Sequence, residues 1–183
     1  MIKVYGVQRT GTNYVRALLR RNTDHTVLMH EFGWKHGKAQ PIVRPPDTQI
    51  VCALVIVKNP YSWLRSIATW GDSERVEIEK VGYARYYNDM YAHYAEFLQV
   101  HWAWMGYDKA TFVRYEELLV DLRRSLEKIC AVFETPLVSC VDVKKVENSD
   151  KFTEEKRQIY LNPEPIEGSG INWDLFGWYG YET

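Results

Sequence analysis

Residues 1–21 read MIKVYGVQRTGTNYVRALLRR, and this stretch decides the fold. The apolar run at residues 2–7 has the length and composition of a short buried strand. Gly6 and Gly11 flank a tight turn, and residues 12–21 then place apolar side chains at helical spacing. A strand, a glycine-containing turn and a helix in this order predict a loop whose backbone N–H groups surround an anion.

This loop differs from the triphosphate-binding loop that it otherwise matches in spacing. Gly6 and Gly11 fit the pattern GxxxxGK[ST], but the next two residues are Thr12 and Asn13. The lysine that neutralises the β and γ phosphates and the hydroxyl that holds magnesium are both displaced. Arg9 instead supplies a cation that can make a two-pronged contact with an oxyanion. We therefore expect a phosphate-type anion here and no metal.

A second strand and helix follow at residues 50–57, IVCALVIV, whose continuous β-branched run is typical of a strand buried on both faces. Asn59 is a good N-cap and Pro60 suits the first helical position. Lys58 ends the strand, and Ser66 lies two turns into the helix. These two side chains form a second candidate anion site. Two such sites at neighbouring strand ends suit a nucleoside with a phosphate at each end.

The rest of the chain continues the alternation of strands and helices. Strands are expected at residues 25–29 and 110–115, mostly helical structure at 73–107, and a helix at 122–133. This alternation predicts a three-layer α/β fold with a central parallel sheet flanked by helices. The length suits a single domain over residues 1–183.

Charge and cysteine content limit the classes of partner and compartment. The net charge of −1 argues against a general polyanion binder, so no nucleic acid partner is expected. Residues 1–50 contain eight Lys or Arg and three acids, while the remainder carries a net −6, which favours an anion site early in the chain. Three cysteines without a CxxC pair, and no long apolar run, predict a soluble, reduced, cytoplasmic protein without a membrane partner.

Three segments resemble motifs of the sulfotransferases that use 3'-phosphoadenosine 5'-phosphosulfate (PAPS). VYGVQRTGTNY resembles their 5'-phosphosulfate loop. VKNPYSWLRSI resembles their 3'-phosphate motif, in which a serine follows the basic residue by eight positions, as Ser66 follows Lys58. FVRYEELLVDLRRSLEKICAVFETPL resembles a later RYEDLL segment and its helix. The three keep the family's order over residues 2–137 and imply its P-loop NTPase-like architecture.

The resemblance also implies roles for individual residues. Arg9 corresponds to the residue that contacts the transferring sulfuryl group, and Lys58 and Ser66 to those that bind the 3'-phosphate. The 5'-phosphate and adenine contacts fall on the residues that follow Arg9, namely Thr10, Gly11, Thr12, Asn13 and Tyr14, with Tyr115 as a weaker adenine-side candidate. Asn13 replaces the family's usual threonine. Lys58 replaces its usual arginine, so a single point charge takes the place of a bidentate contact. Candidates for a late basic motif, which would let the C-terminal part contribute to the 3'-phosphate site, are Lys151, Lys156 and Arg157.

In the family the base that accepts the acceptor's proton follows the second strand. This sequence has HEFGWKHG there, at residues 30–37. Either Glu31 or His36 is the expected base, and Lys35 is expected to stabilise the transferring group. The aromatic run at 83–107 predicts helix packing, with a wall for the acceptor as the alternative, and residues 171–182 predict a tail docked on the core.

The expected reaction is direct in-line transfer of a sulfuryl group from PAPS to a hydroxyl or amine of a small-molecule or carbohydrate acceptor. The product nucleotide is then 3',5'-adenosine bisphosphate (PAP), and no metal takes part. Two alternatives remain open at this stage. One is a nucleotide or small-molecule kinase on the same fold, and the other is a non-catalytic nucleotide-binding module.

Overall fold

The computed structural model describes residues 1–28, 31–42, 50–71, 73–143 and 154–182. In chain order its elements are β1 Ile2–Tyr5, α1 Thr12–Asn22, β2 Val27–Leu28, β3 Cys52–Val57, α2 Pro60–Ala68, α3 Ser73–Val81, α4 Tyr83–Glu96, the π-helical segment η1 Phe97–His101, β4 Lys109–Arg114, α5 Tyr115–Val120, α6 Leu122–Phe133, α7 Glu154–Leu161 and α8 Trp173–Trp178.

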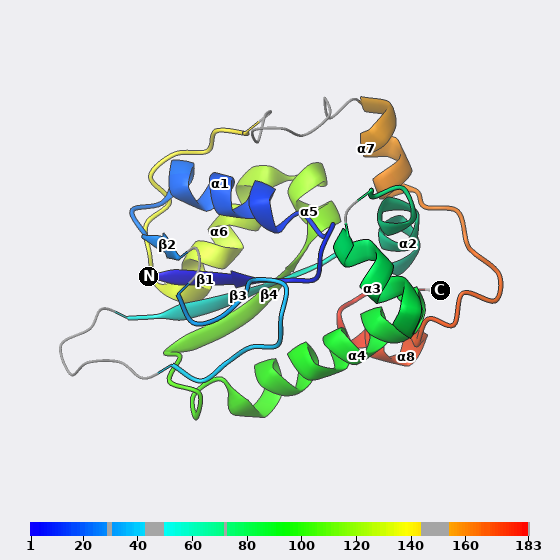
Figure 1. The fold of residues 1–183 in the computed structure, drawn as a ribbon. Coiled ribbons are helices and arrows are strands. Elements are labelled where there is room, and N and C mark those ends of the chain that lie inside the picture. Colours follow the sequence, from blue (N-terminus) through cyan, green and yellow to red (C-terminus); the bar gives the residue numbers. More distant parts are fainter. Residues whose placement is uncertain (29–30, 43–49, 72, 144–153, 183) are drawn as a thin grey trace.

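The four strands form one parallel sheet in the order β2-β1-β3-β4 (Figure 1). β3 occupies the interior, with Val55 paired to Tyr5 of β1 on one side and to Phe112 of β4 on the other. All six residues of β3 are buried. The continuous apolar run therefore forms a central parallel strand, as the sequence predicts.

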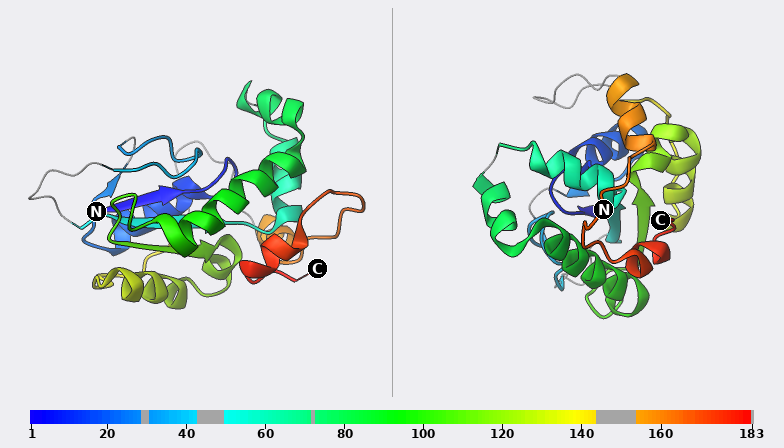
Figure 2. Two further views of the ribbon diagram at one scale, coloured as in Figure 1. Left: turned by 90° about the horizontal axis from the view of Figure 1, so that it is seen from below. Right: turned by 90° about the vertical axis from the view of Figure 1, so that its right-hand side faces the viewer.

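Apolar side chains of the sheet feed two separate cores. Ala53, Val55 and Val57 belong to one cluster, which includes Trp63 of α2 and aromatic side chains of α4. The alternate residues of the same strand pack with α1 and α6 in the other cluster. In Figure 1, α1 and α6 lie above the sheet and α4 below it, and the view from below in Figure 2 has α4 in front of the strands. The predicted α/β fold with a parallel sheet flanked by helices is confirmed.

The helices that follow β3 begin and end at the residues that local chemistry favours. The Asn59 side chain accepts hydrogen bonds from the backbone N–H groups of Tyr61 and Ser62, and Pro60 opens α2. Gly82, at a φ of 93°, separates α3 from α4. The predicted helical stretch is thus two helices and a π-helical segment, and Tyr87, Tyr91 and other rings of α4 fill the core as the packing interpretation requires.

The C-terminal part contains two helices, α7 and α8, that the sequence did not predict. α8 packs beside α4, and its Phe176 ring is fully buried with its centroid 5.1 Å from that of Tyr87. Figure 2 shows the segment between the two helices running along the outside of the molecule. The docked tail is therefore confirmed. None of the helices in the described part of the chain has the length and apolar character needed to cross a membrane.

Candidate functional site

The loop between β1 and α1 has the backbone shape of an anion cradle. Gly11 has a φ of 90° and Arg9 a φ of 67°, so the chain turns sharply twice before α1 begins at Thr12. Within the described residues no side chain caps the first turn of α1, which leaves its N–H groups available to a ligand. A Cβ at Gly11 would lie 2.5 Å from the Tyr115 ring, so only glycine fits there.

The two predicted anion-binding motifs meet at this loop. Arg9 Nε donates to Ser66 Oγ at 3.3 Å, and Lys58 Nζ lies 3.5 Å from the carbonyl oxygen of Arg9. These three residues come from the β1–α1 loop, α2 and the end of β3. Parallel strands bring their carboxyl ends to one edge of the sheet, which is why residues 49 and 57 positions apart from Arg9 reach it.

Lys58 is a buried cation, with 2% of its surface exposed. Its ammonium lies 3.7 Å from the centre of the Tyr160 ring and 5.4 Å from that of Tyr115. Burial lowers the pKa of Lys58 to about 7, opposed by the charge of Glu116. No carboxylate of the described residues forms an ion pair with this ammonium, since the Glu116 oxygens accept from the Asn59 N–H at 2.9 Å and from the Tyr181 hydroxyl at 2.7 Å.

The segment of residues 31–37 packs directly on the anion loop. Lys35 donates through Nζ to Asn13 Oδ1, and the N–H of Gly6 donates to the Lys35 carbonyl at 3.0 Å. His36 Nδ1 lies 2.7 Å from the Gly6 carbonyl oxygen. Because a carbonyl only accepts, Nδ1 carries the proton and Nε2 is the acceptor nitrogen of a neutral ring. Burial lowers the pKa of His36 to about 4.

Glu31 lies at the other end of this segment and is exposed. Lys3, wholly buried in β1, donates through Nζ to the carbonyl oxygens of Glu31 at 2.6 Å and Gly33 at 2.7 Å. Burial lowers the pKa of Lys3 to about 8 and also lowers that of Arg16, and the charge of Glu31 opposes both shifts, so its carboxylate lies near these two cations. Glu31 and His36 thus share one segment but face different neighbours. His30 lies outside the described residues.

The other predicted contact residues surround the loop with distinct roles. Thr10 is buried and donates through its hydroxyl to the Val7 carbonyl at 2.7 Å, which holds the turn. Thr12 is buried as well, so its N–H rather than its side chain is the group near the loop's open side. Tyr14 turns toward Asp142, to which its hydroxyl donates at 2.9 Å, and its ring packs edge-on against Tyr115.

Of the late basic candidates, Arg157 is the one whose side chain the structure describes, and its bonds lead away from Lys58; the Lys156 side chain is outside the described part. Arg157 on α7 donates through Nε to the Leu119 carbonyl at 3.1 Å and through Nη1 to Glu154, which fixes α7 against α5. Lys151 lies outside the described residues. The residue of α7 that does reach the site is Tyr160, through its ring over Lys58.

Sequence reasoning missed several residues that build the site. Lys3 and Glu116 are the clearest cases, because each is a charged residue inside or directly after an apolar strand, and that placement is a usable signal for a buried charge. Gln8 accepts from the Trp63 indole N–H through its carbonyl at 2.7 Å and from the Tyr86 hydroxyl through Oε1 at 2.9 Å. Such pairings join residues 55 and 78 positions apart, which no local pattern encodes.

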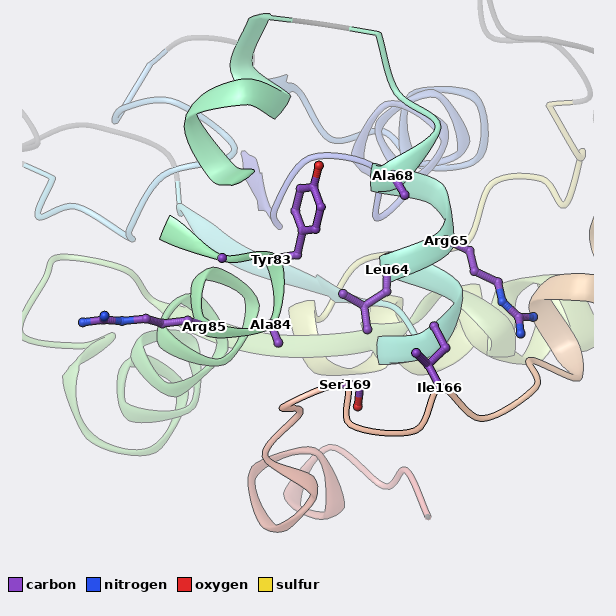
Figure 3. Close-up of a pocket in the computed structure, with 9 residues that line it drawn as sticks. Leu64, Arg65, Ala68, Tyr83, Ala84, Arg85, Ile166 and Ser169 are labelled. Carbon is purple, nitrogen blue, oxygen red and sulfur yellow. The ribbon is translucent and has the colours of Figure 1, made fainter. Parts of the chain in front are cut away.

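A separate groove of about 490 Å³ lies between α2, the start of α4 and the segment before α8 (Figure 3). Leu64 and Ala68 line it from α2, about half a helical turn away from Ser62 and Ser66. Arg65 and Arg85 extend from its rim in opposite directions, away from its apolar centre (Figure 3). The groove shares no lining residue with the anion loop.

Comparisons of the chain with protein-family models, with curated proteins and with solved structures found no match. The site's own residues offer the uncapped first turn of α1, an arginine that spans two motifs and a buried lysine that pairs with no carboxylate in the described part of the chain. All three features favour a ligand that carries more than one negative charge.

Proposed function

We propose that this protein is a PAPS-dependent sulfotransferase with a P-loop-like anion site. The observation that carries the proposal is the convergence of Arg9, Ser66 and Lys58, in which the Arg9 side chain donates to Ser66 and the Arg9 carbonyl lies beside Lys58. One anion position is then the loop at the start of α1, and the other is next to Lys58. Their separation into two positions suits the 5' and 3' phosphates of PAPS better than a linear triphosphate.

In the proposed complex, the loop N–H groups and Arg9 hold the 5'-phosphosulfate. The bond between sulfur and the bridging phosphate oxygen breaks as the acceptor oxygen or nitrogen attacks from the opposite side. The leaving phosphate gains the negative charge, and the guanidinium of Arg9 in the loop stabilises it. The N–H groups and the helix dipole of α1 add to this stabilisation without a metal.

The acceptor's proton passes to a base in the segment of residues 31–37. His36 supports this role because Nδ1 is committed to the Gly6 carbonyl, which leaves Nε2 free of a proton. Glu31 stays the second candidate, since its carboxylate is exposed and faces Lys3 and Arg16. Lys35, anchored on Asn13 at the start of α1, supports charge stabilisation next to the transferring group.

Ligand-dependent stabilisation tests the proposal against the kinase. At about 100 times its dissociation constant a specific ligand adds about 2.7 kcal/mol to the free energy of unfolding. We expect this increase in the free energy of unfolding from PAP without metal, and no such increase from ATP with magnesium. If ATP with magnesium stabilises the protein and PAP does not, the kinase is favoured and the sulfotransferase is rejected.

A transfer assay then separates the enzyme from a binding module. The protein is incubated with PAPS carrying a labelled sulfate and a panel of phenols, amines and sugars. We expect labelled product with at least one acceptor class and stoichiometric PAP. Binding of PAP without label transfer to any acceptor would favour the non-catalytic module.

A further inference from the structure

Arg16 is buried on α1, with 6% of its surface exposed, and two of its nitrogens have no hydrogen-bond partner. These are Nε and Nη2, as judged among the residues that the structure describes. Buried polar groups are nearly always hydrogen-bonded, because an unpaired buried donor costs free energy. The cost is larger for a charged group, so this pair of donors calls for an explanation.

The two unpaired donors have a specific geometry. Nε and Nη2 lie on the same edge of the planar guanidinium group, with parallel N–H bonds. This edge is the fork that binds both oxygens of a carboxylate, sulfate or phosphate. The unsatisfied part of Arg16 is therefore shaped for an oxyanion rather than for a neutral acceptor.

The surroundings of Arg16 carry an excess of positive charge. The charged groups that face one another here are the cations Lys3, Arg16, Arg20 and Lys35 and the carboxylates Glu31 and Glu74. His36, whose pKa Arg16 also lowers, is neutral. With four cations and two carboxylates, the cluster has a formal charge of +2. A bound anion would offset the desolvation of the buried Arg16 charge and its repulsion by Arg20.

The cluster adjoins the anion loop through Lys35, which donates to Asn13 at the start of α1. Arg16 follows Thr12 by one turn of α1, and Lys35 bridges from the 31–37 segment to Asn13. Lys58 and Ser66, by contrast, belong to β3 and α2. The expected base positions, Glu31 and His36, are on the Arg16 side. An oxyanion at Arg16 is therefore distinct from both phosphates of the proposed cofactor.

We propose that Arg16 binds an oxyanion group of the acceptor, so that the substrate class is an anionic small molecule or sugar. The recognised group is a carboxylate, a sulfate ester or a phosphate ester, held by Nε and Nη2 of Arg16. That the oxyanion belongs to an acceptor rests on the proposed function. The anion site itself rests only on the burial of Arg16, its unpaired donors and the charge around them. Arg16 selects the substrate and takes no part in bond making.

Thermal denaturation of the full chain in sodium acetate and in sodium sulfate, at ionic strength matched with sodium chloride, tests the site. Arg16→Met removes the fork, and Arg21→Met is the matched control, because it removes an exposed charge in the last turn of α1 that is not part of the cluster. We expect a saturable rise in melting temperature for the wild type and R21M that R16M lacks. The general salting effect of sulfate is common to all three. A larger rise in acetate identifies the recognised group as a carboxylate. A larger rise in sulfate identifies it as a sulfate or phosphate ester.

Parallel responses of all three proteins would overturn the proposal. So would a large loss of melting temperature in R16M without added anion, because that result would mean the guanidinium is already paired. Arg16→Lys keeps the charge but not the fork, and should fold and respond more weakly than the wild type. An undiminished response of R16K would reject the forked contact.

Titration of the same proteins with PAP separates this proposal from the proposed function. We expect R16M and R21M to bind PAP as the wild type does. Loss of PAP binding in R16M would place Arg16 in the cofactor site and overturn this inference alone. A wild type that responds to acetate or sulfate at Arg16 but not to PAP would retain the anion site and reject the sulfotransferase.

Discussion

At the scale of single residues, Arg9 and Lys58 divide the proposed work between chemistry and binding. Arg9→Ala should lower kcat by about 10²–10³, as loss of a donor to developing charge does, with a smaller effect on PAP affinity. Lys58→Ala should weaken PAP binding by about 10-fold or more, the effect of losing a charged hydrogen bond, with a smaller effect on kcat. Steady-state kinetics with PAP titrations measure both quantities. Equal losses of both in each variant would mean that the roles are misassigned.

The burial of Lys58 makes PAP affinity depend on pH. Its pKa of about 7 in the free protein means that the ammonium is charged below pH 7 and loses its proton above it. A bound phosphate raises this pKa, so binding is strongest below pH 7 and should weaken by up to about 10-fold per pH unit above it. The ligand's phosphates have a second pKa of about 6, so above pH 7 they are almost fully ionised and do not add to this trend.

Lys58→Arg is the control for this pH dependence, since arginine stays charged throughout. Calorimetric titrations with PAP between pH 7 and 9 should give a falling affinity for the wild type and a flat profile for K58R. A flat profile for the wild type would show that Lys58 does not meet a phosphate.

At the scale of the element, the turn into α1 depends on Gly11. Gly11 and Gly82 have nearly the same φ, 90° and 93°, and each precedes a helix. A Cβ at Gly82 meets nothing within 4 Å, whereas one at Gly11 meets the Tyr115 ring at 2.5 Å. The ψ angles differ, since Gly11 is left-handed helical at 16° and Gly82 lies at 123°. Gly11→Ala should cost about 1–2 kcal/mol for its left-handed backbone and about 1–3 kcal/mol more from the clash, and should impair PAP binding. Gly82→Ala should strain only its own backbone.

Chemical denaturation of both glycine variants, with PAP titrations, measures these differences. G82A should bind PAP normally. If G11A matched G82A in stability and in PAP affinity, the close packing of Tyr115 on the loop would not be needed for the site.

The elements differ in how far the sequence predicts them. The strand at residues 52–57 and the helix after Asn59 were predictable because a buried β-branched run and an N-cap with proline are local signals. α7 and α8 were not, because each is short and buries few apolar residues at helical spacing. The proximity of Lys58 and Ser66 to the Arg9 loop was predictable too, because parallel strands bring their carboxyl ends to one edge of the sheet. The burial of Arg16 and its place near the charges of Glu31 and Lys35 depend on tertiary contacts that no local pattern encodes.

At the scale of the whole molecule, the C-terminal tail reaches the anion site from the far end of the chain. Tyr181 donates to Glu116, the half-buried acid whose charge opposes the lowering of the Lys58 pKa. Arg114 donates to the Gly180 carbonyl and fixes the same turn. The tail thus contributes to the electrostatics around Lys58 through Glu116.

Tyr181→Phe should shift the pH profile of PAP binding to lower pH. Loss of the hydroxyl removes a bond that lowers the Glu116 pKa, so the carboxylate loses charge and supports the Lys58 cation less. Tyr179→Phe is the control, because its hydroxyl donates to the Tyr91 carbonyl at 2.8 Å. Both should lose about 1–3 kcal/mol of stability, but only Y181F should move the profile. Identical pH profiles of PAP binding for both variants would show that the tail does not affect the charge of Lys58.

The central claim is that two anion positions, one at the α1 loop and one at Lys58, receive the two ends of one nucleotide. Calorimetric titration of the wild type with PAP and with 5'-AMP, which lacks only the 3'-phosphate, tests it most directly. The account predicts that PAP binds at least about 10-fold more tightly and that Lys58→Ala abolishes this preference. Equal affinities of the wild type for the two nucleotides, or a preference that survives in Lys58→Ala, would contradict it.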